Sequence, residues 1–241
     1  MNRFRLLSVK WTARVLCLLL CAVCLCAAVS ADDPVKMGQS DPESPNPRVA
    51  ITFDDGPHPV YTPEILALLE QYGVRATFFV IGQNVQTHPD LVKQEIAAGH
   101  EVGNHTLSHP NLHSISSDDL IKQLRQTDDI IYTLTQTHPT LFRPPTGLCT
   151  SAVRQAASRM HYDLILWSVD TRDWSKKTSL DHIISEVKNN VRDGSIILFH
   201  DFTVRNDHAT VRALEVILPY LKEQGYRFVT VSELLDTAQP R

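Results

Sequence analysis

The sequence predicts an α/β protein built on a parallel β-sheet, and two features of the chain support this fold class. Short apolar runs alternate with amphipathic stretches from Arg48 to near Thr237, a pattern typical of strands connected by helices. Several runs, such as AITF at 50–53, ATFFVI at 76–81 and SIILF at 195–199, are almost wholly apolar. Strands covered by helices on both faces require this composition. The pattern fits either a closed (β/α) barrel or an open doubly wound sheet.

Each element has a local signal. A helix is expected over 62–72, because apolar residues recur at i, i+3, i+4 and i+7 from Ile65, Thr62-Pro63 provides a cap and a first-turn proline, and Gly73 follows. Ser117 and Ser179 are expected to cap two later helices. The seven expected strands are 49–53, 76–81, 101–104, 141–143, 164–168, 195–199 and 228–231. The expected helices are 62–72, 89–98, 117–134, 151–160, 179–191, 214–221 and a short one that ends near 237.

Residues 1–31 have the pattern of a secretory signal peptide. A basic start precedes an apolar run over 15–29, and Val29-Ser30-Ala31 offers small residues for cleavage. The run is shorter than the ~20 residues of a membrane-spanning helix. We therefore expect a secreted or periplasmic protein, with an uncleaved N-terminal anchor as the alternative. Residues 32–47, rich in Asp, Pro and Ser, are expected to form a flexible linker, and residues 48–237 one domain.

Removal of the leader changes the composition. Four of the five cysteines lie in it, so only Cys149 remains and an internal disulfide is excluded. The leader also holds four of the 23 basic residues and none of the 27 acidic ones, which takes the net charge from -4 to -8. This acidic balance argues against nucleic-acid binding. We expect no membrane span in the mature chain, and a monomer.

Polar clusters follow five of the expected strands. Because the carboxyl ends of parallel strands meet at one face, we expect the clusters to form one site, as in barrel and doubly wound enzymes. The clusters are Asp54-Asp55-Gly56-Pro57, His105–Pro110, Arg143–Gly147, Asp170–Trp174 and His200-Asp201.

Two of these clusters indicate metal chemistry. The four-residue spacing of His105 and His109 lets both imidazoles reach one metal ion, and an aspartate from another loop is the obvious third ligand. The adjacent carboxylates of Asp54 and Asp55 repel each other unless a cation intervenes. A metal on one would leave the other free as a base. The chain contains neither HExxH nor GxSxG, which disfavours a zinc protease and a serine esterase.

Taken in order, the five clusters resemble the five motifs of the polysaccharide deacetylase family, the carbohydrate esterases similar to chitooligosaccharide deacetylase. The resemblance covers roughly residues 48–235. It implies an irregular (β/α)₇ barrel in a single domain, with 48–237 as the catalytic domain. It also implies a hydrolase that acts on linear amides and removes N-acetyl groups from N-acetylglucosamine polymers, such as peptidoglycan or chitin-like oligomers. An O-acetyl xylan esterase and a catalytically silent glycan-binding protein are the alternatives.

The resemblance implies a role for each site residue. Asp55, His105 and His109 would bind a divalent metal, with Zn²⁺ expected and Co²⁺ or another divalent ion as alternatives. Asp54 would be the general base that takes a proton from water. Arg143 would pair with Asp54 and orient it.

The remaining residues would act on the leaving group and the substrate. His200 would protonate the departing amine, oriented by Asp170, and the backbone N–H of Thr146 would stabilise the oxyanion. The family usually has Tyr at the position of Thr146, a departure that bears on substrate preference. The side chains expected to line the substrate pocket are Trp174, Leu198 and Asp173, the last with a helix cap as its alternative role.

Overall fold

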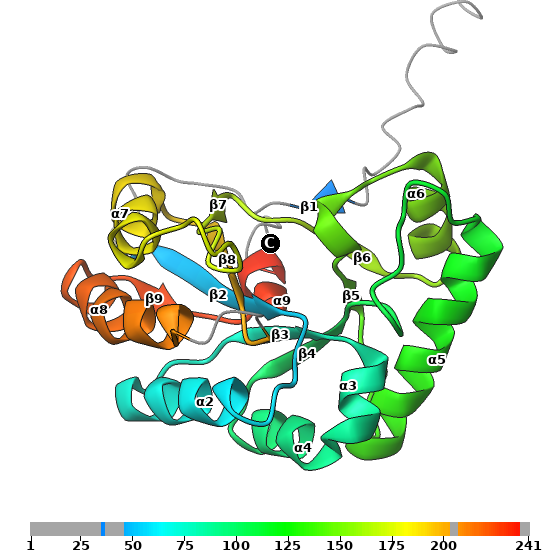
Figure 1. The fold of residues 1–241 in the computed structure, drawn as a ribbon, viewed down its shortest axis with the longest axis horizontal. Coiled ribbons are helices and arrows are strands. Elements are labelled where there is room, and N and C mark those ends of the chain that lie inside the picture. Colours follow the sequence, from blue (N-terminus) through cyan, green and yellow to red (C-terminus); the bar gives the residue numbers. More distant parts are fainter. Residues whose placement is uncertain (1–34, 37–45, 203–206, 237–241) are drawn as a thin grey trace, which may run out of the picture. The chain divides into compact units, whose positions relative to one another are not determined.

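Nine strands, all paired in parallel, form the centre of the computed structural model, which describes residues 35–36, 46–202 and 207–236 (Figure 1). Their order across the sheet is β1-β6-β5-β4-β3-β2-β8-β7, with β9 paired to the start of β2. The strands are β1 Val35–Lys36, β2 Arg48–Asp54, β3 Thr77–Val80, β4 Glu101–Asn104, β5 Leu141–Phe142, β6 Asp163–Ile165, β7 Val169–Asp170, β8 Ser195–His200 and β9 Arg227–Phe228.

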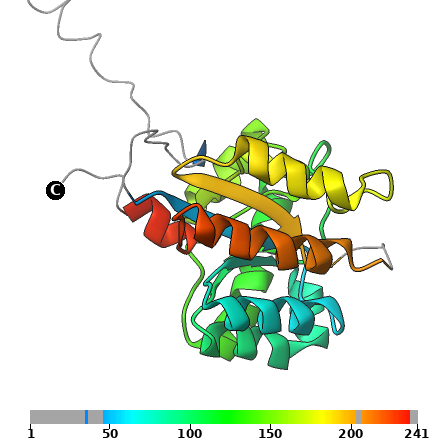
Figure 2. The same cartoon turned by 90° about the vertical axis from the view of Figure 1, so that its left-hand side faces the viewer.

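Helices surround the curled sheet (Figure 1). They are α2 Tyr61–Tyr72, α3 Gly82–Thr87, α4 Pro89–Ala97, α5 Ser117–Thr135, α6 Ser151–Arg159, α7 Leu180–Asn190, α8 Ala209–Glu223 and α9 Val231–Asp236, with a 3₁₀ turn at Pro145–Gly147. Figure 2 shows α7, α8 and α2 packed in that order along one side of the sheet. In the part of the chain that the structure describes, no helix is long and apolar enough to cross a bilayer.

The sheet is a curled, incompletely closed barrel. Among the described strands the pairing path ends at β7 on one side and β1 on the other, and β7 does not pair with β6 although it follows β6 in the chain. The expected fold class, an irregular parallel α/β barrel in a single domain, is confirmed. The strand count differs from seven because β1 and β7 are additional two-residue strands, which are too short to show a periodic pattern. The last expected strand, 228–231, is β9, which covers only Arg227–Phe228.

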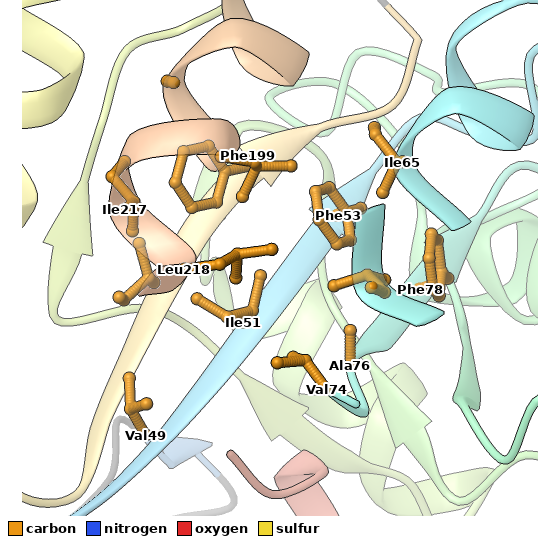
Figure 3. Packing of buried hydrophobic residues seen from close by; sticks show 14 of the residues in the cluster. Val49, Ile51, Phe53, Ile65, Val74, Ala76, Phe78, Phe199, Ile217 and Leu218 are labelled. Carbon is orange, nitrogen blue, oxygen red and sulfur yellow. The ribbon is translucent and has the colours of Figure 1, made fainter. Parts of the chain in front are cut away.

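Strand β2 divides its side chains between two cores. Val49, Ile51 and Phe53 belong to the cluster between the sheet and the surrounding helices (Figure 3). Phe53 stacks on Phe78 with ring centroids 4.9 Å apart. Ala50 belongs instead to the inner cluster of the barrel. Because side chains alternate along a strand, Thr52 and Asp54 point to the same inner side as Ala50, and both are almost fully buried.

Local departures from the expected elements have specific causes. Thr62 does not cap α2; its hydroxyl donates to Asp201 Oδ2 at 2.6 Å and accepts from the His58 N–H at 2.8 Å, so it ties two loops together. The cap of α5 is Ser116, one residue before the expected one, and its Oγ accepts from the Asp119 N–H.

The structure describes part of the expected linker, 32–47, and none of the expected leader. Within the expected linker, Val35–Lys36 is not a flexible segment but pairs with β6, and Lys36 forms a 2.9 Å ion pair with Asp163. The expected leader, 1–31, lies outside the described residues.

Glu95 on α4 is a carboxyl group buried without a hydrogen-bond partner. Its side chain is fully buried, and neither carboxylate oxygen accepts a hydrogen bond. Burial, with a smaller contribution from Asp201, raises the pKa of Glu95 well above its ordinary value of 4.5. In the pH range between the ordinary and the raised pKa, the native state holds a proton that the unfolded chain releases. The free energy of unfolding therefore falls as pH rises through this range.

Substitution Glu95→Gln tests this linkage, because Gln keeps the shape of the protonated acid and does not titrate. We expect the unfolding free energies of variant and wild type to lie close together near pH 4 and the variant to become the more stable as pH rises toward about 8. Urea denaturation at several pH values measures the difference. The exposed Glu70→Gln is the control. A difference between Glu95→Gln and wild type that does not change with pH would contradict the linkage.

Candidate active site

The five polar clusters meet in one pocket of about 340 Å³ at the carboxyl ends of the strands. Strand register brings them together, since pairing of β2 with β8 sets Asp54 opposite His200 and pairing of β7 with β8 sets Asp170 opposite Leu198. The pocket is lined by Asp54, Asp55, His105, His109, Thr146, Trp167, Asp170, Trp174, Leu198 and His200. Two expected site residues, Arg143 and Asp173, are fully buried and do not line it.

Asp55, His105 and His109 form a three-residue cluster whose candidate ligand atoms all lie within 4.8 Å of one another. Asp55 Oδ1 is 3.4 Å from His105 Nε2 and 3.6 Å from His109 Nε2. His105 Nδ1 lies 2.7 Å from the carbonyl oxygen of Arg143. Because a carbonyl only accepts, Nδ1 carries a proton, and Nε2, the atom that faces Asp55, is the candidate ligand atom. Burial tends to lower the pKa of His105, but Asp54, Asp55 and the Arg143 carbonyl together raise it.

The donor set fits a divalent cation. Asp55 Oδ1 is buried and accepts no hydrogen bond, a costly state for a carboxylate unless a cation compensates for it. Burial tends to raise the pKa of Asp55, but the three neighbouring histidines together lower it, so the group is ionised. Burial and the neighbouring His105 lower the pKa of His109, which favours the neutral ring that a ligand requires. One carboxylate and two imidazoles are a ligand set that zinc accepts.

The backbone around this cluster is in an unusual conformation. Asp55, Thr106 and His109 have φ values of 74°, 73° and 52°, and Thr146 and Arg172 in the facing loops have 58° and 53°. Residues other than glycine rarely adopt this left-handed region, and doing so costs energy. The surrounding structure holds five such residues around one pocket, which is typical of functional sites.

Arg143 and Asp54 form an ion pair in the barrel interior. Arg143 Nη1 donates to Asp54 Oδ1 at 2.7 Å and to Thr52 Oγ1 at 2.8 Å. Its guanidinium also donates to two backbone carbonyls on the β6 side and stacks 4.1 Å from the ring centre of Phe79. Burial lowers the pKa of Arg143 and Asp54 opposes this, and an arginine remains protonated in either case. Asp54 Oδ1 is thereby occupied, whereas Oδ2 faces the pocket 3.9 Å from His105 Nε2.

Asp173, not Asp170, is the partner of His200, so the expected contact with Asp170 is wrong. Asp173 Oδ1 lies 2.7 Å from His200 Nδ1, and its Oδ2 accepts from the His200 N–H and the Thr210 hydroxyl. Asp170 accepts from the backbone N–H of Arg172 and lines the pocket. The left-handed turn at Arg172 directs the next residue, Asp173, into the interior. Sequence spacing does not reveal such a turn.

The Asp173 contact alters the protonation of His200. Burial of the ring lowers the pKa of His200, but the Asp173 carboxylate outweighs burial and raises it to about 9. Asp54 and Asp55 contribute in the same direction. The ring is therefore an imidazolium at neutral pH, with Nε2 as its second N–H donor.

Two tryptophans border the pocket, and the sequence predicts only one of them. Trp174 is 51% exposed. Trp167 follows β6, and its ring fits against Gly147, where a Cβ would approach the ring to 2.7 Å. The signal for Trp167 is its place at the carboxyl end of a strand, beside residues already assigned to the site. Leu198 is 3% exposed and forms part of the pocket wall.

Comparisons with known proteins agree on one family. A family model described as polysaccharide deacetylase matches residues 41–165. A peptidoglycan-N-acetylglucosamine deacetylase of Bacillus cereus is 48% identical over 190 residues, which are 78% of this chain and 87% of that protein.

Solved structures have the same fold. The Bc1960 peptidoglycan N-acetylglucosamine deacetylase, crystallised with 4-naphthalen-1-yl-N-oxidanyl-benzamide, is 38% identical with a TM-score of 0.78, over 86% of this chain and 95% of that one. A family 4 acetyl xylan esterase from Clostridium thermocellum, in complex with a cobalt ion, is 36% identical with a TM-score of 0.72, over 80% of this chain and 92% of that one.

The contact between His200 and Asp173 can be tested by titration of the His200 ring. In metal-free protein, NMR of the His200 ring should give a pKa of about 9. Asp173→Asn removes the negative charge and should lower that pKa, whereas Asp170→Asn should change it much less. An equal fall in both variants, or a larger fall in Asp170→Asn, would restore Asp170 as the electrostatic partner.

Proposed function

The chain belongs to the polysaccharide deacetylase family, and on that premise we propose that it removes N-acetyl groups from the N-acetylglucosamine residues of peptidoglycan. Chitin-like oligomers are the related substrates. The observation that carries the proposal is the Asp54–Arg143 pair, set beside the Asp55, His105 and His109 cluster in one pocket. The names of two similar proteins, the Bacillus cereus deacetylase and the Bc1960 deacetylase, support the choice of polymer.

Asp55, His105 and His109 would hold the metal, for which we propose zinc, with cobalt or another divalent ion as alternatives. When bound, the metal would polarise the acetyl carbonyl and lower the pKa of water. The buried, unpartnered Oδ1 of Asp55 and the orientation of His105 support this assignment.

Asp54 is the proposed general base. Arg143 holds the Asp54 side chain in one orientation, because its Nη1 donates to Asp54 Oδ1 and is itself held by Thr52 Oγ1. Oδ1 is used in this contact, which leaves Oδ2 to take the proton from the attacking water. The backbone N–H of Thr146 is the proposed donor to the oxyanion, since the left-handed turn there places Thr146 at the pocket wall.

His200 is the proposed general acid, and Asp173 is its positioning residue. An amine leaves only after its nitrogen gains a proton, and His200 is held as an imidazolium by Asp173. Proton transfer from Nε2 to the departing nitrogen would complete the reaction, with acetate and a free amine as products. Trp174 and Leu198 would line the sugar and the acetyl group, and Asp170 would contact substrate at the pocket wall.

Two alternatives are open to experiment. The similarity to an acetyl xylan esterase favours an O-acetyl esterase as the second candidate. The strongly held proton of His200 favours an amide substrate over an ester. An ester oxygen can leave as an alkoxide, whereas an amide nitrogen that is not protonated is a much poorer leaving group. A catalytically silent glycan-binding protein is disfavoured because a candidate for each role, nucleophile activation, metal binding and leaving-group protonation, lies in one pocket.

We further propose that the protein is exported. Residues 1–31 would be the signal peptide, 32–47 a linker apart from the strand at Val35–Lys36, and 48–237 the catalytic domain of a monomer. Peptidoglycan lies outside the cytoplasm, so the proposed substrate and the proposed export agree.

Acetate release from peptidoglycan, chitooligomers and acetylxylan tests the function, with and without a chelator. We expect release from the first two, a loss of more than tenfold on chelation, and recovery with Zn²⁺ or Co²⁺. His109→Ala should weaken zinc binding by calorimetry, and the exposed His161→Ala is the matched control. Release that persists after chelation would contradict the metal mechanism. Release from acetylxylan alone would favour the esterase, and glycan binding without release from any polymer would favour the binding protein.

A further inference from the structure

A second groove, of about 670 Å³, adjoins the acetyl pocket and shares Trp174 with it. Its lining includes Arg172, Lys177, Ser179 and His182. None of these four has a role in the proposed chemistry. A glycan whose reacting sugar occupies the pocket would reach this groove with a neighbouring sugar, because one exposed tryptophan borders both.

The groove collects positive charge in a chain that is acidic as a whole, with a net charge of -4. The side chain of Arg172 is 67% exposed, and its Nε is 3.9 Å from Asp170 Oδ2, too far for a charge-assisted hydrogen bond. Lys177 is exposed at the same groove. Helix α7 begins beside them, capped by Ser179, so its partly positive amino end adds to the field.

Acidic groups offset only part of this field, because Asp170 is 3.9 Å from Arg172 Nε but lines the acetyl pocket and not the groove. Asp173, next to Arg172 in the chain, is fully buried and contacts His200 and Thr210. Asp181 lies in the first turn of α7, next to His182 in the chain, but it does not line the groove. The groove therefore combines a tryptophan face for a sugar ring with two cationic side chains for an anion.

We propose that this groove binds a carboxylate on the sugar next to the one that is deacetylated. The inference rests on the proposed function and narrows its substrate class to acidic glycans. In peptidoglycan strands every second sugar, N-acetylmuramic acid, has a lactyl ether whose carboxyl group is a free carboxylate wherever no stem peptide is attached, whereas chitin and its oligomers have no such group. Arg172 and Lys177 would pair with the carboxylate while Trp174 contacts the ring between them and the acetyl pocket.

The test compares three oligomers of equal length: peptide-free glycan strands with free lactyl carboxylates, the same strands with these carboxylates amidated, and chitooligomers. Wild-type protein should have the highest kcat/KM on the free carboxylate. Lys177→Gln should lower that value roughly three- to fivefold, mainly through KM. This change should not alter kcat/KM on the two neutral oligomers. High salt should weaken only the preference for the free carboxylate.

Lys177→Arg keeps the charge and should retain the preference for the free carboxylate. Lys93→Gln on α4 is a control for loss of an exposed lysine elsewhere. An equal loss on all three oligomers, or no preference of the wild type for the carboxylate, would overturn the proposal. Acetate release from none of them would refute the proposed function instead. Calorimetry would then test carboxylate binding by the groove on its own. Tighter binding of the free-carboxylate strand, lost in Lys177→Gln, would support the groove proposal, and equal binding of all three oligomers would overturn it.

Discussion

The buried ion pair between Arg143 and Asp54 is the interaction on which the rest of the site depends. Two charges in a protein interior are costly unless hydrogen bonds satisfy them fully, and loss of one partner leaves the other uncompensated. Here Thr52, two backbone carbonyls and the Phe79 ring surround the guanidinium. The barrel interior thus holds a rigid cation, and that cation fixes the carboxylate of Asp54 beside the cluster of Asp55, His105 and His109.

The same pair links the core to the chemistry. Side chains alternate along β2, so Val49, Ile51 and Phe53 point to the helices. Thr52 and Asp54 therefore point to the interior, where both accept hydrogen bonds from Arg143. A shift of one residue in the register of β2 would exchange the two sets and destroy both the core and the site. Burial of the apolar set, at about 1.5–3 kcal/mol for each large side chain, therefore also fixes the position of Asp54, the proposed base.

Much of this arrangement could be predicted from the chain, because strand ends carry the polar clusters and parallel strands align their ends. That reasoning was sufficient for a parallel α/β sheet and for the place of five residues in one pocket, Asp54, Asp55, His105, His109 and His200. The choice of a barrel over an open doubly wound sheet came from the family resemblance. It failed where loop conformation decides the contact. The left-handed turn at Arg172 places Asp173, and not the expected Asp170, beside His200. Thr62, expected to cap a helix, donates its hydroxyl to Asp201 instead. Trp167 was missed because it lay inside the strand expected over 164–168, whereas β6 ends at Ile165 and leaves Trp167 just beyond it.

The claim that Arg143 acts through Asp54 is tested most directly by a double-mutant cycle in kcat, with metal content and thermal stability checked for each variant. Arg143→Lys keeps a charge but loses the planar set of donors that holds Asp54. We predict that it lowers kcat roughly ten- to a hundredfold in the wild-type background and has little further effect when Asp54 is already Asn, because the two residues act as a unit. An equal loss in both backgrounds would show that Arg143 acts independently of Asp54 and would contradict the account.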